Sequence, residues 1–325
     1  MSECHHSVAA PTLDEIRAAR KRIAAAAIRT PLIRLNVDDA PAEIYLKLEN
    51  LQPIGSFKLR GAGNAMQLAG AQKLAKGVYT ASAGNMAQGV AWNARQMGVP
   101  CEVIVPDHAP QTKLAAITRL GAKIVKVPFD QWWQVIIEHR YAGMAGFFIH
   151  PVSDTAVMAG NGTIGLEILE DLPQVDAVVI PYGGGGLSCG IASALRTLKP
   201  EAKIYACEVE SAAPLRAALR AGVPTPVAYT PSFVDGIGSK SVLAEMWPLV
   251  KNLIEDSLVL PLAEVAAALR LLLERNRVIA EGAGATPVAA ALAGKCGRGK
   301  VVCVVSGGNI DLEKLAQVVA SEGYP

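Results

Sequence analysis

Short apolar runs alternate with longer segments of helical periodicity along most of the chain. The apolar runs predict strands at 77–82, 101–106, 123–127, 147–151, 176–183, 203–210 and 301–309. The segments between them predict helices at 85–97, 111–120, 130–142, 187–198 and 311–320. Continuous apolar strands that alternate with helices are typical of an α/β fold, in which a mostly parallel sheet has helices on both faces.

The N-terminal part of this pattern starts with a helix. A capping box from Thr12 to Glu15 predicts where that helix begins, and we expect it to continue through Ile28. No Pro/Gly-rich linker marks a domain boundary. Ligands of α/β folds bind at the carboxyl ends of the strands, so the residues after each strand are the candidates for function.

One lysine lies in an unusual setting, the segment ENLQPIGSFKLRGAGNA. Lys58 follows Gly55, Ser56 and Phe57, whereas a lysine that only aids solubility belongs on a polar face. The small and apolar neighbours indicate burial, which lowers the pKa of a lysine and makes its neutral amine available for chemistry. The alternative is a lysine at a loop edge whose ammonium group reaches solvent.

A run of four glycines follows the predicted strand at 176–183. Gly183 to Gly186 lead into a helix, where backbone N–H groups can converge on a phosphate. The alternatives are a plain turn or a dinucleotide site, in which Glu208 after the next strand would hold a ribose. Ser188 stands where the third glycine of GxGxxG belongs, so phosphate is the better interpretation.

Two shorter polar loops also follow strands. Ser82, Gly84 and Asn85 can hold a carboxylate at a helix N-terminus, or simply cap that helix. Ser306 can bond a ring nitrogen, or cap the last helix. Two glycine-rich loops, 231–238 and 280–285, contain one carboxylate each and are either part of a site or ordinary turns. A reactive lysine, a phosphate site, a carboxylate loop and a hydroxyl for a ring nitrogen together match pyridoxal 5′-phosphate.

Composition narrows the class of protein. The 325 residues fit one large domain or two smaller ones, and the formal net charge of +2 without a basic run argues against nucleic-acid binding. No apolar run is long enough to cross a membrane, and the N-terminus lacks the apolar core of a signal peptide. The six cysteines form no CxxC, and Cys101, Cys207 and Cys303 read as reduced core thiols of a cytoplasmic protein. The adjacent His5 and His6, near Cys4, do not predict a zinc site.

The motifs GSFKLRGA, SAGN, GGGGL and SGGN, in this order, resemble the fold type II pyridoxal-phosphate enzymes of the threonine/serine dehydratase family, which includes serine racemase. The resemblance covers nearly the whole chain. It implies a fold like that of the tryptophan synthase β-subunit, with two open, twisted, mostly parallel sheets. It also implies a small domain at 71–154 and a large domain from 1–70 and 155–325, with the cofactor at their interface. A homo-oligomer, commonly a dimer, is the expected assembly.

The resemblance assigns roles to residues of the motifs. Lys58 would bind pyridoxal 5′-phosphate as a Schiff base, Phe57 would lie against the ring, and Asn85 would bond the phenolic oxygen. The phosphate would be held by Gly183, Gly184, Gly185, Gly186 and Leu187. Ser306 would meet the pyridine nitrogen. The substrate carboxylate would lie at the loop of Ser82, Ala83, Gly84, Asn85 and Met86.

Several positions depart from the family pattern. Ala83 replaces a serine of the racemases that protonates the opposite face, so elimination is favoured over racemisation. Met86 and Val152 replace more polar or aromatic residues, which suits a roomier, apolar pocket. Glu208 and Ala212 match cation ligands of some relatives and are the candidates for a metal site, but Pro214 stands at the position of their aspartate, which argues against a divalent cation.

The sequence thus predicts a dehydratase, or ammonia-lyase, that converts a β-hydroxy-α-amino acid to a 2-oxo acid and ammonia. The expected substrate is L-threo-3-phenylserine, or L-threonine and L-serine. Four alternatives remain open: a serine racemase, a β-replacing synthase of the same fold, a dinucleotide-binding oxidoreductase and a non-catalytic binding module.

Overall fold

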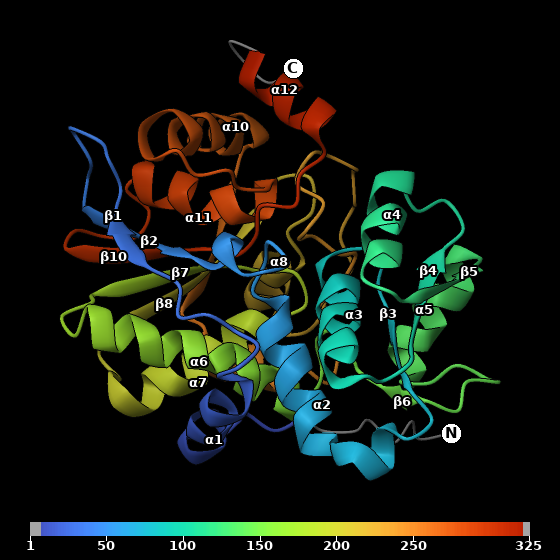
Figure 1. Cartoon of the computed structure of the whole chain (residues 1–325). Helices are drawn as coiled ribbons and strands as arrows, with labels where there is room; N and C mark the ends of the chain where they lie inside the picture. The colour runs from blue at the N-terminus through green and yellow to red at the C-terminus, as the bar shows by residue number, and fades with distance from the viewer. Residues whose placement is uncertain (1–7, 321–325) are drawn as a thin grey trace.

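The computed structural model describes residues 8–320 and contains two sheets (Figure 1). The larger sheet has the order β1-β2-β10-β7-β8-β9, and only its β1/β2 pair is antiparallel. Its strands are β1 (Leu32–Arg34), β2 (Glu43–Leu48), β7 (Ala177–Pro181), β8 (Lys203–Val209), β9 (Asp256–Leu260) and β10 (Lys300–Val305). The smaller sheet, β5-β4-β3-β6, is parallel throughout. Its strands are β3 (Val78–Ala81), β4 (Cys101–Pro106), β5 (Lys123–Val127) and β6 (Phe147–Phe148). The predicted fold class is confirmed.

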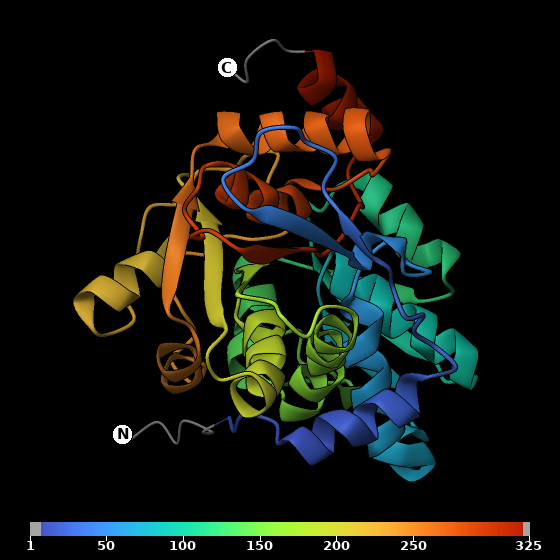
Figure 2. The same cartoon turned by 90° about the vertical axis from the view of Figure 1, so that its left-hand side faces the viewer.

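Helices cover both faces of the larger sheet. Figures 1 and 2 show α10 and α11 on one face and α6 and α7 on the other. The helices of the first half are α1 (Leu13–Ile23), α2 (Lys58–Leu74), α3 (Asn85–Met97), α4 (Gln111–Arg119), α5 (Phe129–Glu138) and α6 (Thr155–Asp171). Those of the second half are α7 (Gly186–Leu198), α8 (Pro214–Ala221), α9 (Trp247–Leu253), α10 (Leu262–Leu271), α11 (Gly282–Leu292) and α12 (Leu312–Ala320). A 3-10 turn (Glu49–Leu51) and a π-helical turn (Leu272–Asn276) complete the elements.

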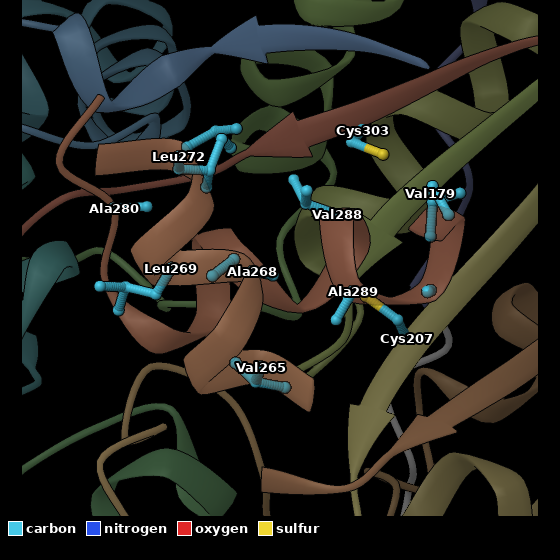
Figure 3. Close-up of a cluster of buried hydrophobic side chains, with 14 of the residues drawn as sticks. Val179, Cys207, Val265, Ala268, Leu269, Leu272, Ala280, Val288, Ala289 and Cys303 are labelled. Atoms are coloured by element: carbon cyan, nitrogen blue, oxygen red, sulfur yellow. The ribbon is translucent and has the colours of Figure 1, made fainter. Parts of the chain in front are cut away.

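The core on the α10/α11 side of the larger sheet explains why its strands are apolar along their whole length. Val179 of β7, Cys207 of β8 and Cys303 of β10 pack with Val288 of α11 and Leu269 of α10 (Figure 3). A second buried cluster lies against the other face. Both faces of these strands therefore remove apolar surface from water, which is the main stabilising contribution to the fold.

Five cysteines lie in the described part of the chain, and all are buried and free. Burial raises the pKa of the Cys101 thiol to about 12. These thiols are core residues, as predicted, while Cys4, His5 and His6 lie outside the described residues. Between residues 8 and 320, no helix is both long and apolar enough to cross a membrane.

The first helix is shorter than predicted. It has the expected capping box but ends at Ile23 instead of Ile28. The Gln52 side chain bonds both the N–H and the carbonyl of Ile28, and Arg60 donates to the same carbonyl. These tertiary hydrogen bonds use the backbone groups of Ile28, which therefore does not continue the helix. All strands of the smaller sheet fall within 71–154. The division into domains at these residues stays a prediction.

Candidate active site

Every residue predicted to bind cofactor or substrate lines one cavity of about 420 Å³. Loops after β3, β7 and β10 form much of its wall, so the carboxyl ends of strands from both sheets meet there. The lining includes Phe57, Lys58, Ser82, Ala83, Gly84, Asn85, Met86, Gly183, Gly184, Gly185, Gly186, Leu187 and Ser306. Its size is typical of a small-molecule site.

Lys58 is the first residue of α2 and is accessible only in part. Its Nζ donates a hydrogen bond to the Pro151 carbonyl at 3.1 Å and lies 5.1 Å from the centre of the Phe57 ring. Burial lowers the pKa of Lys58 to about 8, against a smaller opposing effect of the Glu281 carboxylate. A substantial fraction of this amine is therefore neutral near physiological pH, in agreement with the prediction.

A buried ionic cluster fixes the start of α2. The Arg60 guanidinium donates to both oxygens of Glu49 at 2.8 Å and to Glu167 at 2.6 and 3.0 Å. Lys47 donates to Glu167 at 2.6 Å, and all four side chains are buried. Two cations balance two carboxylates, so the cluster is neutral as a whole. Arg60 lies two residues after Lys58, so the cluster anchors the backbone next to that lysine.

The glycine loop joins β7 to α7 and allows close approach of the backbone. Gly185 has a φ of +100°, and a Cβ on Gly184 would lie 2.7 Å from a methyl group of Val152. No side chain caps α7, whose N-cap is Gly185. The N–H groups of its first turn are thus left for an anion, and the helix dipole favours negative charge there.

The amide of Asn85 is held in one orientation. Its Nδ2 donates to both oxygens of Glu281, at 2.9 and 3.1 Å, and its Oδ1 accepts from Asn309 Nδ2 at 2.8 Å. Nδ2 carries the two N–H groups and faces Glu281, whereas Oδ1 faces Asn309, so these partners fix which end of the amide is the donor. Burial raises the pKa of Glu281 to about 7. The sequence placed Glu281 in a glycine-rich loop and Asn309 in the SGGN motif, and it gave neither residue a role.

The loop before α3 provides a second anion site. Gly84 N donates to the Ser82 hydroxyl at 3.2 Å, and no side chain caps the helix, which starts at Asn85. The first amides of α3 are therefore available to a carboxylate. Met86 is buried in the apolar core of the smaller sheet and lines the cavity beside this loop.

Four aromatic side chains form a further part of the wall, which we call the aromatic arc: His108, Phe129, Trp132 and Trp133. Neighbouring ring centres lie 5.9, 5.6 and 6.2 Å apart along the arc. Sequence reasoning assigned 130–142 to a helix and missed this role. The signal was present as three aromatic residues within five positions, 129–133.

Two histidines and a carboxylate lie together close to Lys58. The potential ligand atoms of His139, His150 and Glu245 are all within 4.8 Å of one another. Both ring nitrogens of His150 are already used. Nδ1 accepts from the N–H groups of Val152 and Ser153, and Nε2 bonds the Ile136 carbonyl. Burial lowers the pKa of His150 to about 3, so its ring is neutral and shapes the turn that presents Pro151 to Lys58.

The weak cation candidates lie elsewhere. The Glu208 carboxylate accepts hydrogen bonds from Leu215 N, Arg216 N and Ser257 Oγ at 2.9, 2.8 and 2.6 Å. It therefore caps α8, which begins at Pro214. Neither Glu208 nor Ala212 is part of the cavity wall, so the geometry gives Glu208 no contact with a ribose in this cavity.

The residues of the cavity fit pyridoxal 5′-phosphate. Lys58 supplies an amine for the aldehyde, and the uncapped amides at the start of α7 suit the phosphate. The Asn85 amide, whose Nδ2 is held in one orientation by Glu281, suits a phenolic oxygen. Ser306 is buried, follows β10 and lines the same cavity, where its hydroxyl suits a ring nitrogen.

Comparison with known proteins points to the same cofactor as the residues of the cavity. The family described as "Pyridoxal-phosphate dependent enzyme" matches residues 23–307. An L-threonine ammonia-lyase of Thermotoga maritima is 39% identical over 313 residues, covering 95% of this chain and 78% of that protein. A catabolic L-threonine dehydratase of Escherichia coli is 36% identical over 314 residues, covering 94% of this chain and 95% of that protein.

Solved structures show the same architecture. Maize serine racemase superposes with a TM-score of 0.88 at 30% identity, covering 95% of this chain and 97% of that one. The processed form of threonine deaminase isoform 2 from Solanum lycopersicum has a TM-score of 0.85 at 33% identity, covering 96% of this chain and 90% of that one.

Proposed function

This chain belongs to the family of pyridoxal-phosphate-dependent enzymes, and we propose that it is a dehydratase of β-hydroxy-α-amino acids. The observation that carries the proposal is the place of Lys58, whose lowered pKa coincides with a cavity that has anion sites at the start of both α3 and α7. Relatives named as threonine ammonia-lyase and dehydratase support a lyase reaction. The family contradicts the dinucleotide-binding alternative.

The chemistry follows from the residues around the cavity. When bound, pyridoxal phosphate supplies a sink for the electron pair left at the substrate Cα. Neutral Lys58 takes the proton from Cα, and the hydroxyl leaves Cβ with a proton as water. The unsaturated amine takes up a proton at Cβ and becomes an imine, water adds to the imine carbon, and ammonia leaves, which gives the 2-oxo acid. Ser306 carries no charge, so it cannot reinforce the electron sink as a carboxylate would. A moderate sink favours early loss of the hydroxyl.

We propose that the substrate is held through its carboxylate. The amides at the start of α3 and the Ser82 hydroxyl form the site for that group. Fixing the carboxylate there orients Cα toward Lys58, which lines the same cavity. Orientation of this kind contributes to catalysis without any additional chemical group.

We further propose L-threo-3-phenylserine as the preferred substrate, with L-threonine and L-serine as the smaller alternatives. Met86 and Val152 both line the cavity with apolar surface, which suits a phenyl group. Val152 also packs against Gly184, so its side chain occupies part of the cavity beside the glycine loop.

The proposal is tested by measuring products. The protein with pyridoxal phosphate should release 2-oxo acid and ammonia in a ratio of one to one, with no added oxidant or reductant. Added sulfide should not divert the product, whereas a β-replacing synthase would form a thiol amino acid. Formation of that thiol product instead of 2-oxo acid contradicts the dehydratase proposal.

Racemisation should be low because Ala83 has no proton to donate. Ala83 lines the cavity beside the carboxylate site, so the variant Ala83→Ser places a hydroxyl there. We expect Ala83→Ser to raise the amount of D-enantiomer in recovered substrate several-fold, measured by chiral chromatography. Ala83→Thr is the bulkier comparison. An unchanged enantiomer ratio in Ala83→Ser would mean that this position does not decide between the two reactions.

Attachment of the cofactor should depend on pH through Lys58. Only the neutral amine attacks an aldehyde, and the pKa of about 8 predicts that the rate rises with pH and levels off near pH 9. A lysine with the ordinary pKa of 10.5 would instead keep gaining about tenfold per pH unit over this range. The measurement mixes cofactor-free protein with pyridoxal phosphate, reduces it with borohydride and quantifies the labelled Lys58 peptide. A rate that keeps rising beyond pH 9 contradicts the lowered pKa.

A further inference from the structure

We propose that the aromatic arc of His108, Phe129, Trp132 and Trp133 is the subsite for an aryl substituent on the substrate Cβ. This inference rests on the proposed function, since it names the class of substituent that the same cavity accepts. It adds specificity-determining residues that the motifs around Lys58 do not contain.

The rings of the arc form one continuous surface. The interplanar angles are 37°, 37° and 42° between successive pairs, with centre separations of 5.6 to 6.2 Å. Aromatic pairs prefer tilted or offset geometries at 4.5 to 7 Å. A further ring can therefore join this series with the same geometry, as a substrate phenyl group would.

The arc lies at the edge of the smaller sheet where the carboxyl ends of its strands meet. His108 follows β4, and Phe129 opens α5 directly after β5 and Pro128. Ser82 follows β3, which pairs with β4 in the same parallel sheet. The carboxylate site and the arc thus share the carboxyl edge of neighbouring strands, as the two ends of one substrate require.

Phe129 and Trp133 are not part of the core around α5, while Trp132 packs partly against it. Val135 and Ile136 are the buried residues of α5, whereas Phe129 is 43% and Trp133 is 38% exposed. Two of the four tryptophans in the chain stand side by side at this wall. Large aromatic groups left exposed at a cavity are typical of a contact surface for an apolar ligand.

The charges of the wall argue against an acidic substituent. The lysines among the described lining residues are Lys58 and Lys113. Lys113 Nζ donates a hydrogen bond to Asp235 Oδ2 at 2.9 Å. Lys113 is therefore already paired. Val152, Leu243 and Ile136 add apolar surface to the wall. The substituent that fits this lining best is an uncharged aromatic ring.

The test uses L-phenylalanine, which carries the ring but has no β-hydroxyl to eliminate, and L-alanine as its small counterpart. Calorimetric titration of the cofactor-loaded protein should show L-phenylalanine binding roughly tenfold more tightly than L-alanine, the scale of one good aromatic contact. Trp132→Leu and, separately, Phe129→Leu should each remove most of this preference while leaving the Kd of L-alanine within about twofold. Trp92→Leu is the matched control, because Trp92 lies on α3 and not in the cavity wall.

The outcomes separate this inference from the proposed function. Equal Kd values for the two amino acids in the wild-type protein would overturn the aryl subsite, even if threonine and phenylserine are both dehydrated. A preference for L-phenylalanine that persists in both variants would also overturn it, provided that circular dichroism shows folded protein. A preference lost in the variants supports the arc, even if phenylserine yields no 2-oxo acid and the dehydratase proposal fails.

Discussion

Lys58→Ala is expected to lower the rate of 2-oxo acid formation by about 10³-fold or more. The variant loses both the amine that binds the cofactor and the base that takes the Cα proton. It should also lose the visible absorbance of the lysine-bound cofactor and the borohydride-stable label in its peptide. The loss should be far larger than that of a single binding contact, because one side chain serves two steps.

Lys113→Ala is the matched control for this prediction. Lys113 lines the same cavity, but its ammonium group is paired with Asp235 and lies outside the proposed chemistry. The visible absorbance of the cofactor-loaded Lys113→Ala variant should therefore resemble that of the wild type. Full activity of Lys58→Ala would refute the assignment of the catalytic lysine.

Arg60→Ala should lower the free energy of unfolding by about 3–5 kcal/mol, the range for breaking a buried ion pair. The change leaves Glu49 and Glu167 buried with only Lys47 as a cationic partner. Uncompensated charge in the interior is costly because the protein solvates it poorly. The fall should appear as a lower urea midpoint by circular dichroism. Arg60→Lys keeps the charge but not the paired geometry, so its loss should be smaller.

Arg20→Ala is the control on the surface. Arg20 pairs with Glu170, but both side chains are more than a third exposed, so the expected loss is below about 1 kcal/mol. Similar midpoints for Arg60→Ala and Arg20→Ala would contradict the anchoring role of the buried cluster.

The site could be predicted from sequence because its parts follow strands of parallel sheets. Apolar runs place the strands, and the carboxyl ends of such strands meet. Lys58, Asn85, the glycine loop and Ser306 therefore come together although up to 248 positions separate them, from 58 to 306. The smaller sheet could also be predicted from the sequence, since β4 and β5 coincide with the apolar runs at 101–106 and 123–127.

Other features depend on packing that the pattern does not contain. The helix α2 is rich in glycine and has little periodicity, because it lies close to α6. A Cβ on Gly61 would come within 2.7 Å of Val157. The turn after Ile23 depends on a distant glutamine, Gln52. Glu281 acts through Asn85, almost two hundred residues away, and the arc lines the cavity only because β4 and β5 are neighbours.

One comparison of three substrates tests the proposed dehydratase most directly. Purified protein with pyridoxal phosphate is supplied with L-threo-3-phenylserine, L-threonine and L-serine in turn, and the release of 2-oxo acid is followed for each. We expect 2-oxo acid with matching ammonia, and a higher kcat/KM for phenylserine than for the two smaller substrates. Turnover of threonine or serine with no gain for phenylserine would contradict the preference for a phenyl group. No 2-oxo acid from any of the three would contradict the dehydratase itself.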